Sequence, residues 1–133
     1  MIIGIGTDIM EINRIEKIVT QHGDAFLNKY FTHSEQEYAR SKSNTMAQSL
    51  TSAWVVKEAI SKALGTGIRG DITLKSISLQ RNEKGAPSVV LLDGSHKKAM
   101  ELSDNKGYTC FVSISHDNGM ANAFVVMEKN NDV

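Results

Sequence analysis

The longest hydrophobic pattern in the chain runs from Met46 to Gly67 and predicts a buried helix. Apolar side chains recur there at three- and four-residue spacing, the period of an amphipathic helix, at Met46, Leu50, Ala53, Val56, Ile60, Ala63 and Leu64. The opposite side is also largely apolar, around two charged residues, Glu58 and Lys62. We therefore expect this helix at the centre of the fold, closed by Gly65 and Gly67.

An alternating pattern at the start of the chain predicts a β-strand from Ile2 to Ile9. One face of this strand carries isoleucine and threonine side chains, and the other carries Ile2, Gly4, Gly6 and Asp8. Glycine weakens a strand unless another group must approach its backbone, so the bare face predicts close contact with a helix or a ligand. The alternative is that the two glycines only relieve crowding.

The remaining patterns predict shorter helices and two hairpins. Helices are expected over residues 11–21 and 96–102, the second capped by Ser95, and Thr32 or Ser34 is expected to cap a further helix. The expected strands cover residues 72–80, 88–92, 109–116 and 120–128, the last two joined by the turn signal Asp-Asn-Gly. These elements predict an α+β fold in which an antiparallel sheet wraps against the long central helix.

Length and composition describe an ordinary globular protein with a single domain over residues 1–133. Fifteen acidic and fifteen basic residues leave no overall basic field, so we expect neither nucleic acid nor a membrane surface as partner. No run approaches the roughly twenty apolar residues of a membrane span. Cys110 is the only cysteine, and we expect a buried structural thiol in a protein of the reducing cytoplasm.

Two carboxylates in apolar surroundings, Asp8 and Glu58, are the first candidates for chemistry. A carboxylate that loses water needs a cation, hydrogen bonds or a metal to stay charged. If the two converge, their repulsion would protonate one of them unless a divalent cation lies between them. An all-oxygen pair with room for water and phosphate suits magnesium. The alternative is that Asp8 caps a helix and Glu58 forms an ion pair.

Lys62 stands one helical turn after Glu58. The simplest interpretation is a salt bridge between the two side chains, which would stabilise the end of the helix. A lysine drawn into a pocket with a metal can instead neutralise phosphate charge in a transition state.

The run Ser-Ile-Ser-His ends a predicted strand at His116. A hydrolase would use Ser115 as a nucleophile activated by His116, but adjacent residues of a strand point to opposite faces, which disfavours that interpretation. A non-catalytic module that binds a nucleotide or a carrier protein also stays open at this level.

Taken together, the motifs resemble the holo-(acyl-carrier-protein) synthase family, the small bacterial 4′-phosphopantetheinyl transferases. The matching stretches are GIGTDIMEINRI, KYFTHSE, VVKEAISKALGTGI, the turn at Gly85 and Pro87, and SISH, in the order and spacing of the family. They span nearly the whole chain. The motifs Asp-Ile-x-Glu-Ile and Lys-Glu-Ala-x-x-Lys-Ala-Leu-Gly are highly specific in combination.

The resemblance implies transfer of 4′-phosphopantetheine from coenzyme A to a serine of apo acyl carrier protein, with release of adenosine 3′,5′-bisphosphate, in support of fatty acid biosynthesis and lipid metabolism. It also implies the 4′-phosphopantetheinyl transferase fold and a homotrimer with active sites between neighbouring subunits. In the family, the residues that match Asp8 and Glu58 hold Mg²⁺ on the coenzyme A pyrophosphate. Residues that match the lining of the coenzyme A cleft are Lys57, Lys62, Gly65, Thr66, Gly67, Pro87, Ser115 and His116.

The resemblance assigns the catalytic roles to Asp8, Glu58 and Lys62. We expect in-line attack by the carrier serine on the β-phosphorus, with Mg²⁺ and Lys62 stabilising charge on the pyrophosphate. Glu58 is the candidate base, directly or through a bound water.

The family's carrier-docking helix matches residues 11–21, where Arg14, Lys17 and Gln21 would meet an acidic helix of the carrier. That helix is often more basic in the family than Arg14 and Lys17 make it here. Residues 54–56, Trp-Val-Val, replace the usual Phe-Ala-Ala. Larger side chains at this point are expected to narrow the cleft or to adjust subunit packing.

Overall fold

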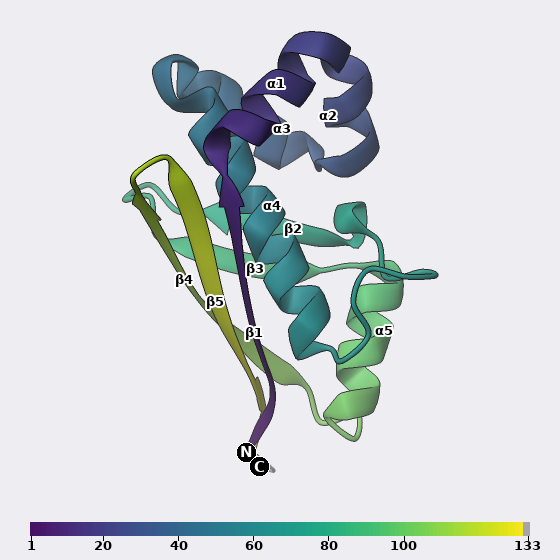
Figure 1. The fold of residues 1–133 in the computed structure, drawn as a ribbon. Helices are drawn as coiled ribbons and strands as arrows, with labels where there is room; N and C mark the ends of the chain where they lie inside the picture. The colour runs from purple at the N-terminus through teal and green to yellow at the C-terminus, as the bar shows by residue number, and fades with distance from the viewer. Residues whose placement is uncertain (132–133) are drawn as a thin grey trace.

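Helix α4, Met46–Ala63, lies at the centre of the structure, as the hydrophobic pattern predicts (Figure 1). The computed structural model describes residues 1–131. Both sides of α4 are buried, and five of its apolar side chains are at most 1% exposed: Leu50, Val55, Val56, Ala59 and Ile60. Gly65 takes a φ of +81°, a left-handed conformation that glycine adopts without steric cost, and so ends the helix.

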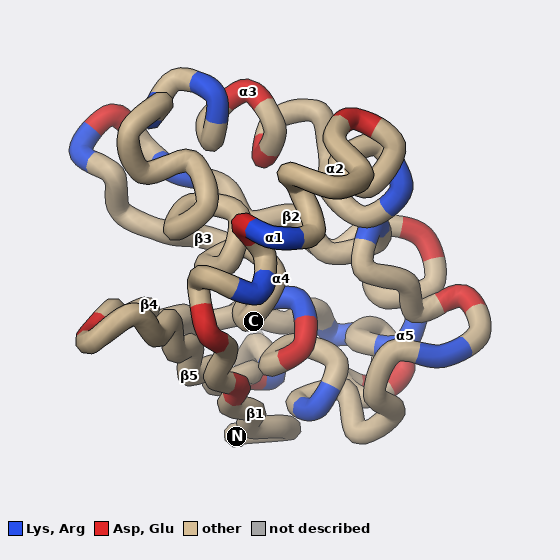
Figure 2. Tube along the Cα trace, turned by 45° about the horizontal axis from the view of Figure 1, so that its top comes forward, with Lys and Arg blue, Asp and Glu red and all other residues tan. Residues whose placement is uncertain are grey.

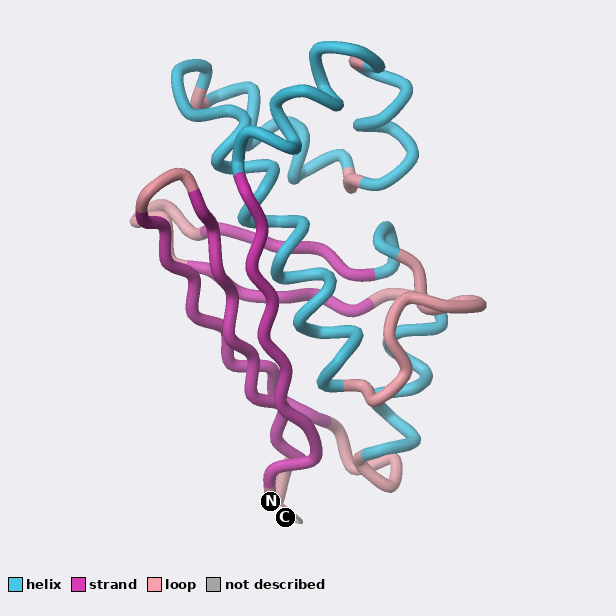
Figure 3. The backbone as a smooth tube through the Cα atoms, viewed as in Figure 1, coloured by secondary structure: helices cyan, strands magenta, loops and turns pink. Residues whose placement is uncertain are grey.

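A three-stranded antiparallel sheet in the order β1-β5-β4 packs against one side of α4 (Figure 3). Its strands are β1 (Ile2–Glu11), β4 (Tyr108–Asp117) and β5 (Met120–Lys129). The central strand buries four side chains completely: Ala121, Ala123, Val125 and Met127. The Asp-Asn-Gly signal forms the predicted turn between β4 and β5, since Asn118 and Gly119 both have positive φ.

The glycines of β1 let the strand and α4 touch through their backbones. A Cβ added to Gly4 would lie 2.0 Å from the carbonyl oxygen of Ala63, and one added to Gly6 would lie 1.9 Å from that of Ala59. Non-bonded atoms do not tolerate such distances, so any side chain here would push the helix away. The bare face therefore serves the close approach of a helix, and it presents Asp8 to the same helix.

The other two strands form a separate antiparallel hairpin, β2 (Ile77–Arg81) with β3 (Pro87–Leu91). The predicted strand over residues 72–80 is wrong in its first half. Thr73 and Ser76 exchange hydrogen bonds between backbone amide and side chain, which caps a 3₁₀ turn and delays the extended structure. The α+β fold with antiparallel strands around a long helix is confirmed, but the strands form two sheets rather than one.

Shorter helices flank α4 and the sheets. They are α1 (Ile12–His22), α2 (Asp24–Tyr30), α3 (His33–Ser41), α5 (Asp93–Leu102) and the 3₁₀ turns η1 (Ser43–Thr45) and η2 (Leu74–Ser76). Thr32, one of the two predicted caps, caps α3 together with Glu35. The prediction that Ser95 caps α5 is wrong, because the helix begins at Asp93. The buried Ser95 side chain instead lies 2.5 Å from the hydroxyl oxygen of Ser76.

Charged residues of both signs are interspersed over the helices, whereas β4 and β5 carry few of them (Figure 2). No helix within residues 1–131 is long and apolar enough to cross a membrane. Cys110 is a free thiol that is half-buried on β4 rather than fully buried. Burial raises its pKa to about 11, so it is almost entirely protonated at neutral pH and a poor nucleophile.

Candidate functional site

Asp8, Glu58 and Lys62 come together where the free edge of β1 runs beside α4. The Lys62 Nζ donates to the carbonyl oxygen of Thr7 at 2.8 Å and lies 3.3 Å from Asp8 Oδ1. The expected salt bridge between Glu58 and Lys62 is not formed: among the residues described, the carboxylate within 4.0 Å of the ammonium is that of Asp8. The lysine therefore connects α4 to β1 instead of forming a salt bridge within its own helix.

Glu58 is the electrostatically least favourable member of this group. Partial burial, and then the negative charge of Asp8, raise the pKa of the Glu58 carboxyl above its ordinary value, while Lys62 opposes the change. Two carboxylates thus lie near one ammonium, which pairs with Asp8, and one negative charge is in excess when all three are ionised. An arrangement of this kind favours the approach of a further cation.

The donor set fits a magnesium ion. Mg²⁺ is usually held by one or two carboxylates, with water and substrate phosphate completing its octahedron. Asp8 and Glu58 supply two carboxylates, and the pKa of Glu58 is raised first by burial and then by the charge of Asp8, which Lys62 only opposes. Within the described chain, no group of three His, Cys, Asp or Glu side chains is placed to hold a metal. The pair is therefore suited to an ion that arrives with a phosphate ligand.

The predicted glycine loop follows Lys62 directly. Open space lies where a Cβ would stand on Gly65 or Gly67. The amides of Gly65, Thr66 and Gly67 donate to the carbonyl oxygens of Lys62 and Ser61 and close the helix. The loop therefore offers a ligand room to approach rather than unpaired N–H donors.

His116 lies in another place, next to the first half of α4. The His116 Nε2 is 2.6 Å from Ser52 Oγ, and the Ser52 hydroxyl donates its single proton to the Gln48 carbonyl oxygen at 2.9 Å. Ser52 must then accept from His116, which places an imidazole proton on Nε2. Burial, and then the positive charge of Arg81, lower the pKa of His116. Pro87 pairs with Arg81 in the β2–β3 hairpin.

Ser115 points to the opposite face of β4 from His116. It pairs with Asn122, whereas His116 pairs with Ala121 on the side of the helix. The two side chains diverge, so the run Ser-Ile-Ser-His forms no nucleophile and base pair. The hydrolase interpretation is therefore not supported by the geometry, and Ser115 does not join His116.

Most of the predicted site residues lie on two flanks of one chain. Asp8 pairs with Ala123 on β5, which pairs in turn with Ile114 on β4, close to His116. Two strand spacings amount to about 10 Å. We call the first group the Asp8 set (Asp8, Glu58, Lys62 and Gly65–Gly67) and the second the His116 set (Ser52, Arg81, Pro87 and His116).

Lys57, predicted to line the coenzyme A cleft, belongs to neither set. Its side chain is fully buried and its Nζ lies 2.7 Å from Glu35 Oε1 and donates to the carbonyl oxygens of Leu74 and Ile77. Burial lowers the pKa of Lys57, and Glu35 opposes the change. Because protein groups surround the ammonium, Lys57 belongs to the core and not to the ligand site.

Residues 54–56, which were expected to narrow the cleft or to adjust subunit packing, also pack inside the fold. Trp54 stacks on Phe26 with ring centres 5.8 Å apart and meets Tyr30 edge-on at 5.5 Å, so it packs against α2. Val55 and Val56 are fully buried. The large side chains therefore fill the helical core and do not narrow the approach to the Asp8 set.

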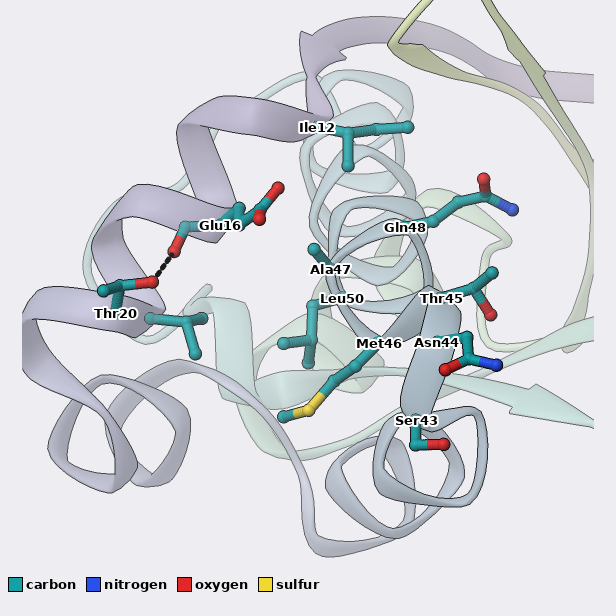
Figure 4. A pocket seen from close by; sticks show the side chains of 11 residues that line it. Ile12, Glu16, Thr20, Ser43, Asn44, Thr45, Met46, Ala47, Gln48 and Leu50 are labelled. Carbon is teal, nitrogen blue, oxygen red and sulfur yellow. Dashed lines mark hydrogen bonds between the residues drawn. The ribbon is translucent and has the colours of Figure 1, made fainter.

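Helix α1 exposes Arg14, Lys17 and Gln21 together, as the helical spacing predicts. On the opposite flank of α1, a hollow of about 390 Å³ lies between this helix and the start of α4 (Figure 4). Its walls carry a single charged residue, Glu16. An acidic wall repels phosphate, so this hollow is not a candidate for the coenzyme A diphosphate.

Sequence reasoning did not single out Ser52 or Arg81. Their partners lie far away along the chain, since 64 residues separate Ser52 from His116. The available signal was the position of Arg81 just before the predicted Gly85 and Pro87 turn, which brings it opposite Pro87 in the hairpin.

The chain is similar to known proteins over nearly its full length. The family model described as the 4′-phosphopantetheinyl transferase superfamily matches residues 4–118. The holo-(acyl-carrier-protein) synthase of Clostridium perfringens (strain 13 / Type A) is 43% identical over 129 residues, which is 96% of this chain and 95% of the relative.

Solved structures agree with this similarity. The crystal structure of holo-(acyl-carrier-protein) synthase from Neisseria meningitidis has a TM-score of 0.81 at 31% identity, covering 97% of this chain and 100% of that one. The Bacillus anthracis enzyme in complex with CoA (3′,5′-ADP) has a TM-score of 0.78 at 31% identity, covering 98% and 99%.

Proposed function

The chain belongs to the 4′-phosphopantetheinyl transferase superfamily, and we propose that the Asp8 set carries out its chemistry as a holo-(acyl-carrier-protein) synthase. Such an enzyme transfers 4′-phosphopantetheine from coenzyme A to a serine of apo acyl carrier protein. The observation that carries the residue assignment is the meeting of two carboxylates and one lysine at an open strand edge. This arrangement accepts a diphosphate together with a cation.

The reaction joins the carrier serine Oγ to the β-phosphorus of coenzyme A and breaks the bond from that phosphorus to the bridging oxygen. We assign the serine proton to Glu58, directly or through a water, because a carboxyl with a raised pKa is a better base near neutral pH. The Lys62 ammonium stabilises the negative charge that develops on the departing adenosine 3′,5′-bisphosphate. Asp8 holds the ammonium in place at 3.3 Å.

Magnesium belongs to this proposal as the cofactor, with Asp8 and Glu58 as its protein ligands. When bound, it neutralises charge on the diphosphate. The excess negative charge of the Asp8 set and its all-oxygen donors support the assignment.

Transfer is tested with coenzyme A, Mg²⁺ and an apo carrier protein by measuring the mass of the carrier. Addition of one phosphopantetheine group is the expected result. A carrier that another synthase modifies but this protein leaves unchanged would overturn the activity. A binding module would retain coenzyme A without altering the carrier, and a hydrolase would release coenzyme A from a thioester.

The exposed basic side of α1 is the proposed docking surface for the acidic carrier helix. Arg14→Glu should raise the KM for the carrier by about tenfold or more, because a like charge at a docking surface opposes association. The KM for coenzyme A should stay within about twofold, since α1 takes no part in the Asp8 set. Steady-state kinetics with each substrate varied in turn measure both values. Arg40→Glu on α3 is the matched control, and an equal rise in both KM values would argue against docking on α1.

The outer face of the three-stranded sheet supports the proposal of a homotrimer. No helix within residues 1–131 covers this face (Figure 1), and four large side chains on it are 47–61% exposed: Ile5, Ile9, Phe111 and Phe124. Apolar patches of this kind mark protein interfaces. Copies packed through their sheets would bring the Asp8 set of one chain toward the His116 set of the next, which places each active site between two subunits.

Phe124→Asp should therefore convert the assembly to monomers and remove most of the transfer activity. The substitution places a charge on an exposed position, so the circular dichroism spectrum of the folded chain should be retained. Analytical ultracentrifugation gives the mass of the assembly, and Lys97→Asp on α5 is the control. A monomeric wild-type protein, or a Phe124→Asp variant that stays oligomeric and active, would contradict the proposed arrangement.

We propose the metabolic pathway and the cellular compartment of the activity on chemical grounds. Holo carrier protein is the acyl acceptor that fatty acid biosynthesis and lipid metabolism use. We place the enzyme in the cytoplasm, where a reducing environment suits the free thiol of Cys110.

A further inference from the structure

The turn between β4 and β5 carries the only Asn-Gly pair of the sequence, Asn118 and Gly119. Asn118 has a φ of +51° and Gly119 one of +76°, the left-handed backbone of a two-residue hairpin turn. Both residues are exposed, and open space lies where a Cβ would stand on Gly119. The side-chain amide of Asn118 is therefore next to a backbone nitrogen that no side chain shields.

The backbone amide of Gly119 also makes no hydrogen bond within residues 1–131. The ladder of the hairpin ends at the pair of Asp117 and Met120, on either side of the turn. The amide between the two central residues of such a turn takes no part in that ladder. Its nitrogen is therefore available to react with a neighbouring carbonyl carbon.

Asn105 provides a contrast within the same chain. It is exposed and also left-handed, with a φ of +61°. The amide that follows it, however, belongs to Lys106, which has a side chain, and donates to the carbonyl oxygen of Ser103 at 3.0 Å. The amide after Asn118 is thus unhindered and without a hydrogen bond, whereas the amide after Asn105 is neither.

The same turn holds the first residue of α1 (Figure 1). The carbonyl oxygen of Gly119 accepts a hydrogen bond from the Ile12 amide at 2.9 Å, and Glu11, which precedes the helix, makes no side-chain cap. The first amides of a helix have no partner within it. The turn therefore stabilises the start of α1 in place of a capping side chain.

We propose that Asn118 is a site of spontaneous deamidation, and that its product loosens the start of the carrier-docking helix α1. The Gly119 nitrogen attacks the Asn118 Cγ and forms a carbon–nitrogen bond. The side-chain nitrogen leaves as ammonia and takes up the proton of the backbone amide. The resulting cyclic imide adds one water molecule at either of its carbonyl carbons and opens to aspartate or to isoaspartate.

The two products differ in their effect on the turn. Isoaspartate passes the backbone through its own side chain and so adds one methylene to the turn. Because the length of a turn fixes the register of a hairpin, the Gly119 carbonyl oxygen would shift away from the Ile12 amide. Aspartate keeps the backbone length and adds a negative charge beside Asp117. The effect on docking rests on the proposed function, in which α1 binds the carrier.

The modification is tested by incubating the folded protein at mildly alkaline pH and mapping its peptides by mass spectrometry. The peptide with Asn118 should gain the mass difference between an amide and a carboxylic acid, and a protein-isoaspartate methyltransferase should methylate it. Asn105 is the internal control and should keep its amide over the same period. Asn118→Gly is the matched variant, because glycine accepts the left-handed backbone and has no side-chain amide.

The effect on docking is measured by steady-state kinetics on fresh and incubated protein. Incubation should raise the KM for the carrier by about two- to tenfold, the effect of weakening one hydrogen bond at the start of a helix. The KM for coenzyme A should stay within about twofold, and incubated Asn118→Gly should behave as fresh protein. The methyltransferase with S-adenosylmethionine returns isoaspartate to the imide, so this treatment should lower the KM again.

An Asn118 that keeps its amide, or that loses it no faster than Asn105, would overturn the modification site. A deamidated protein with an unchanged KM for the carrier would overturn the effect on docking, as would an equal rise in incubated Asn118→Gly. Failure of the proposed function is distinguishable, because fresh wild-type protein would then leave the carrier unmodified while the peptide map still reports the state of residue 118.

Discussion

Replacing Glu58 with glutamine should lower the turnover number for carrier modification by about 10²- to 10⁴-fold, the range expected when a general base is lost. Glutamine keeps the size of the side chain but cannot accept the serine proton or hold Mg²⁺ as a carboxylate does. The measurement is the initial rate of mass change of the carrier at saturating coenzyme A and Mg²⁺. Glu101→Gln on α5 is the control, and full activity of Glu58→Gln would remove Glu58 from the site.

The stability of this variant provides an independent check. A carboxyl whose pKa is raised in the folded state contributes stability below its ordinary value of 4.5, and this contribution is lost as the pH rises through the folded pKa. Glutamine has no such dependence. Glu58→Gln should therefore melt at a temperature equal to or above that of the wild type at pH 7, and the difference should shrink below pH 4.5. A large drop in melting temperature at pH 7 would mean that the loss of activity reflects unfolding.

Replacing Lys57 with methionine should destabilise the fold by about 3–5 kcal/mol, the usual cost of breaking a buried ion pair. The substitution leaves the carboxylate of Glu35 in the core without its cation. It also leaves the carbonyl oxygens of Leu74 and Ile77 without this donor. Urea denaturation gives the free energy of unfolding. Lys97→Met on the surface of α5 is the control and should change stability by less than about 0.5 kcal/mol.

A double-mutant cycle separates the ion pair from the packing of the lysine stem. Glu35→Gln removes the negative charge and keeps an acceptor oxygen for only one of the two amides, those of Thr32 and Leu79, that donate to separate oxygens of the carboxylate. The double variant should lose clearly less stability than the sum of the two single variants, because neither charge is then left alone. Additive losses would contradict a coupled pair. If Lys57 bound coenzyme A instead, its substitution would raise the KM for coenzyme A with little change in stability.

Elements whose signal lies within a short stretch of sequence could be predicted well. The hydrophobic periodicity of α4, the alternation along β1 and the Asp-Asn-Gly turn all depend on neighbouring residues, and the structure confirms them. The glycine face of β1 predicted a close contact with its backbone. The sequence did not decide whether a helix or a ligand makes that contact. The strand expected over residues 72–80 failed because Thr73 and Ser76 favour a capped turn over extended backbone.

Site residues were harder to predict wherever the decisive partner is distant in sequence. Lys57 looks like a ligand residue beside Glu58, and only the position of Glu35 on α3 reveals it as part of the core. The division into two sets follows from the strand order β1-β5-β4, which no local pattern encodes. Family resemblance supplied Pro87 and His116, but the fold was needed to place them away from Asp8.

The backbone contact between β1 and α4 restricts how this protein can change over evolution. The gap between β1, which carries Asp8, and the helix that carries Glu58 is set by main-chain atoms, because a Cβ on Gly4 or Gly6 would lie only 1.9–2.0 Å from a carbonyl oxygen of α4. Side chains elsewhere in the core can therefore change in size and alter the stability of the fold, while the two carboxylates keep their separation. Gly4 and Gly6 have no such freedom, so a lineage that lost either glycine would lose the spacing of the two carboxylates at the same step.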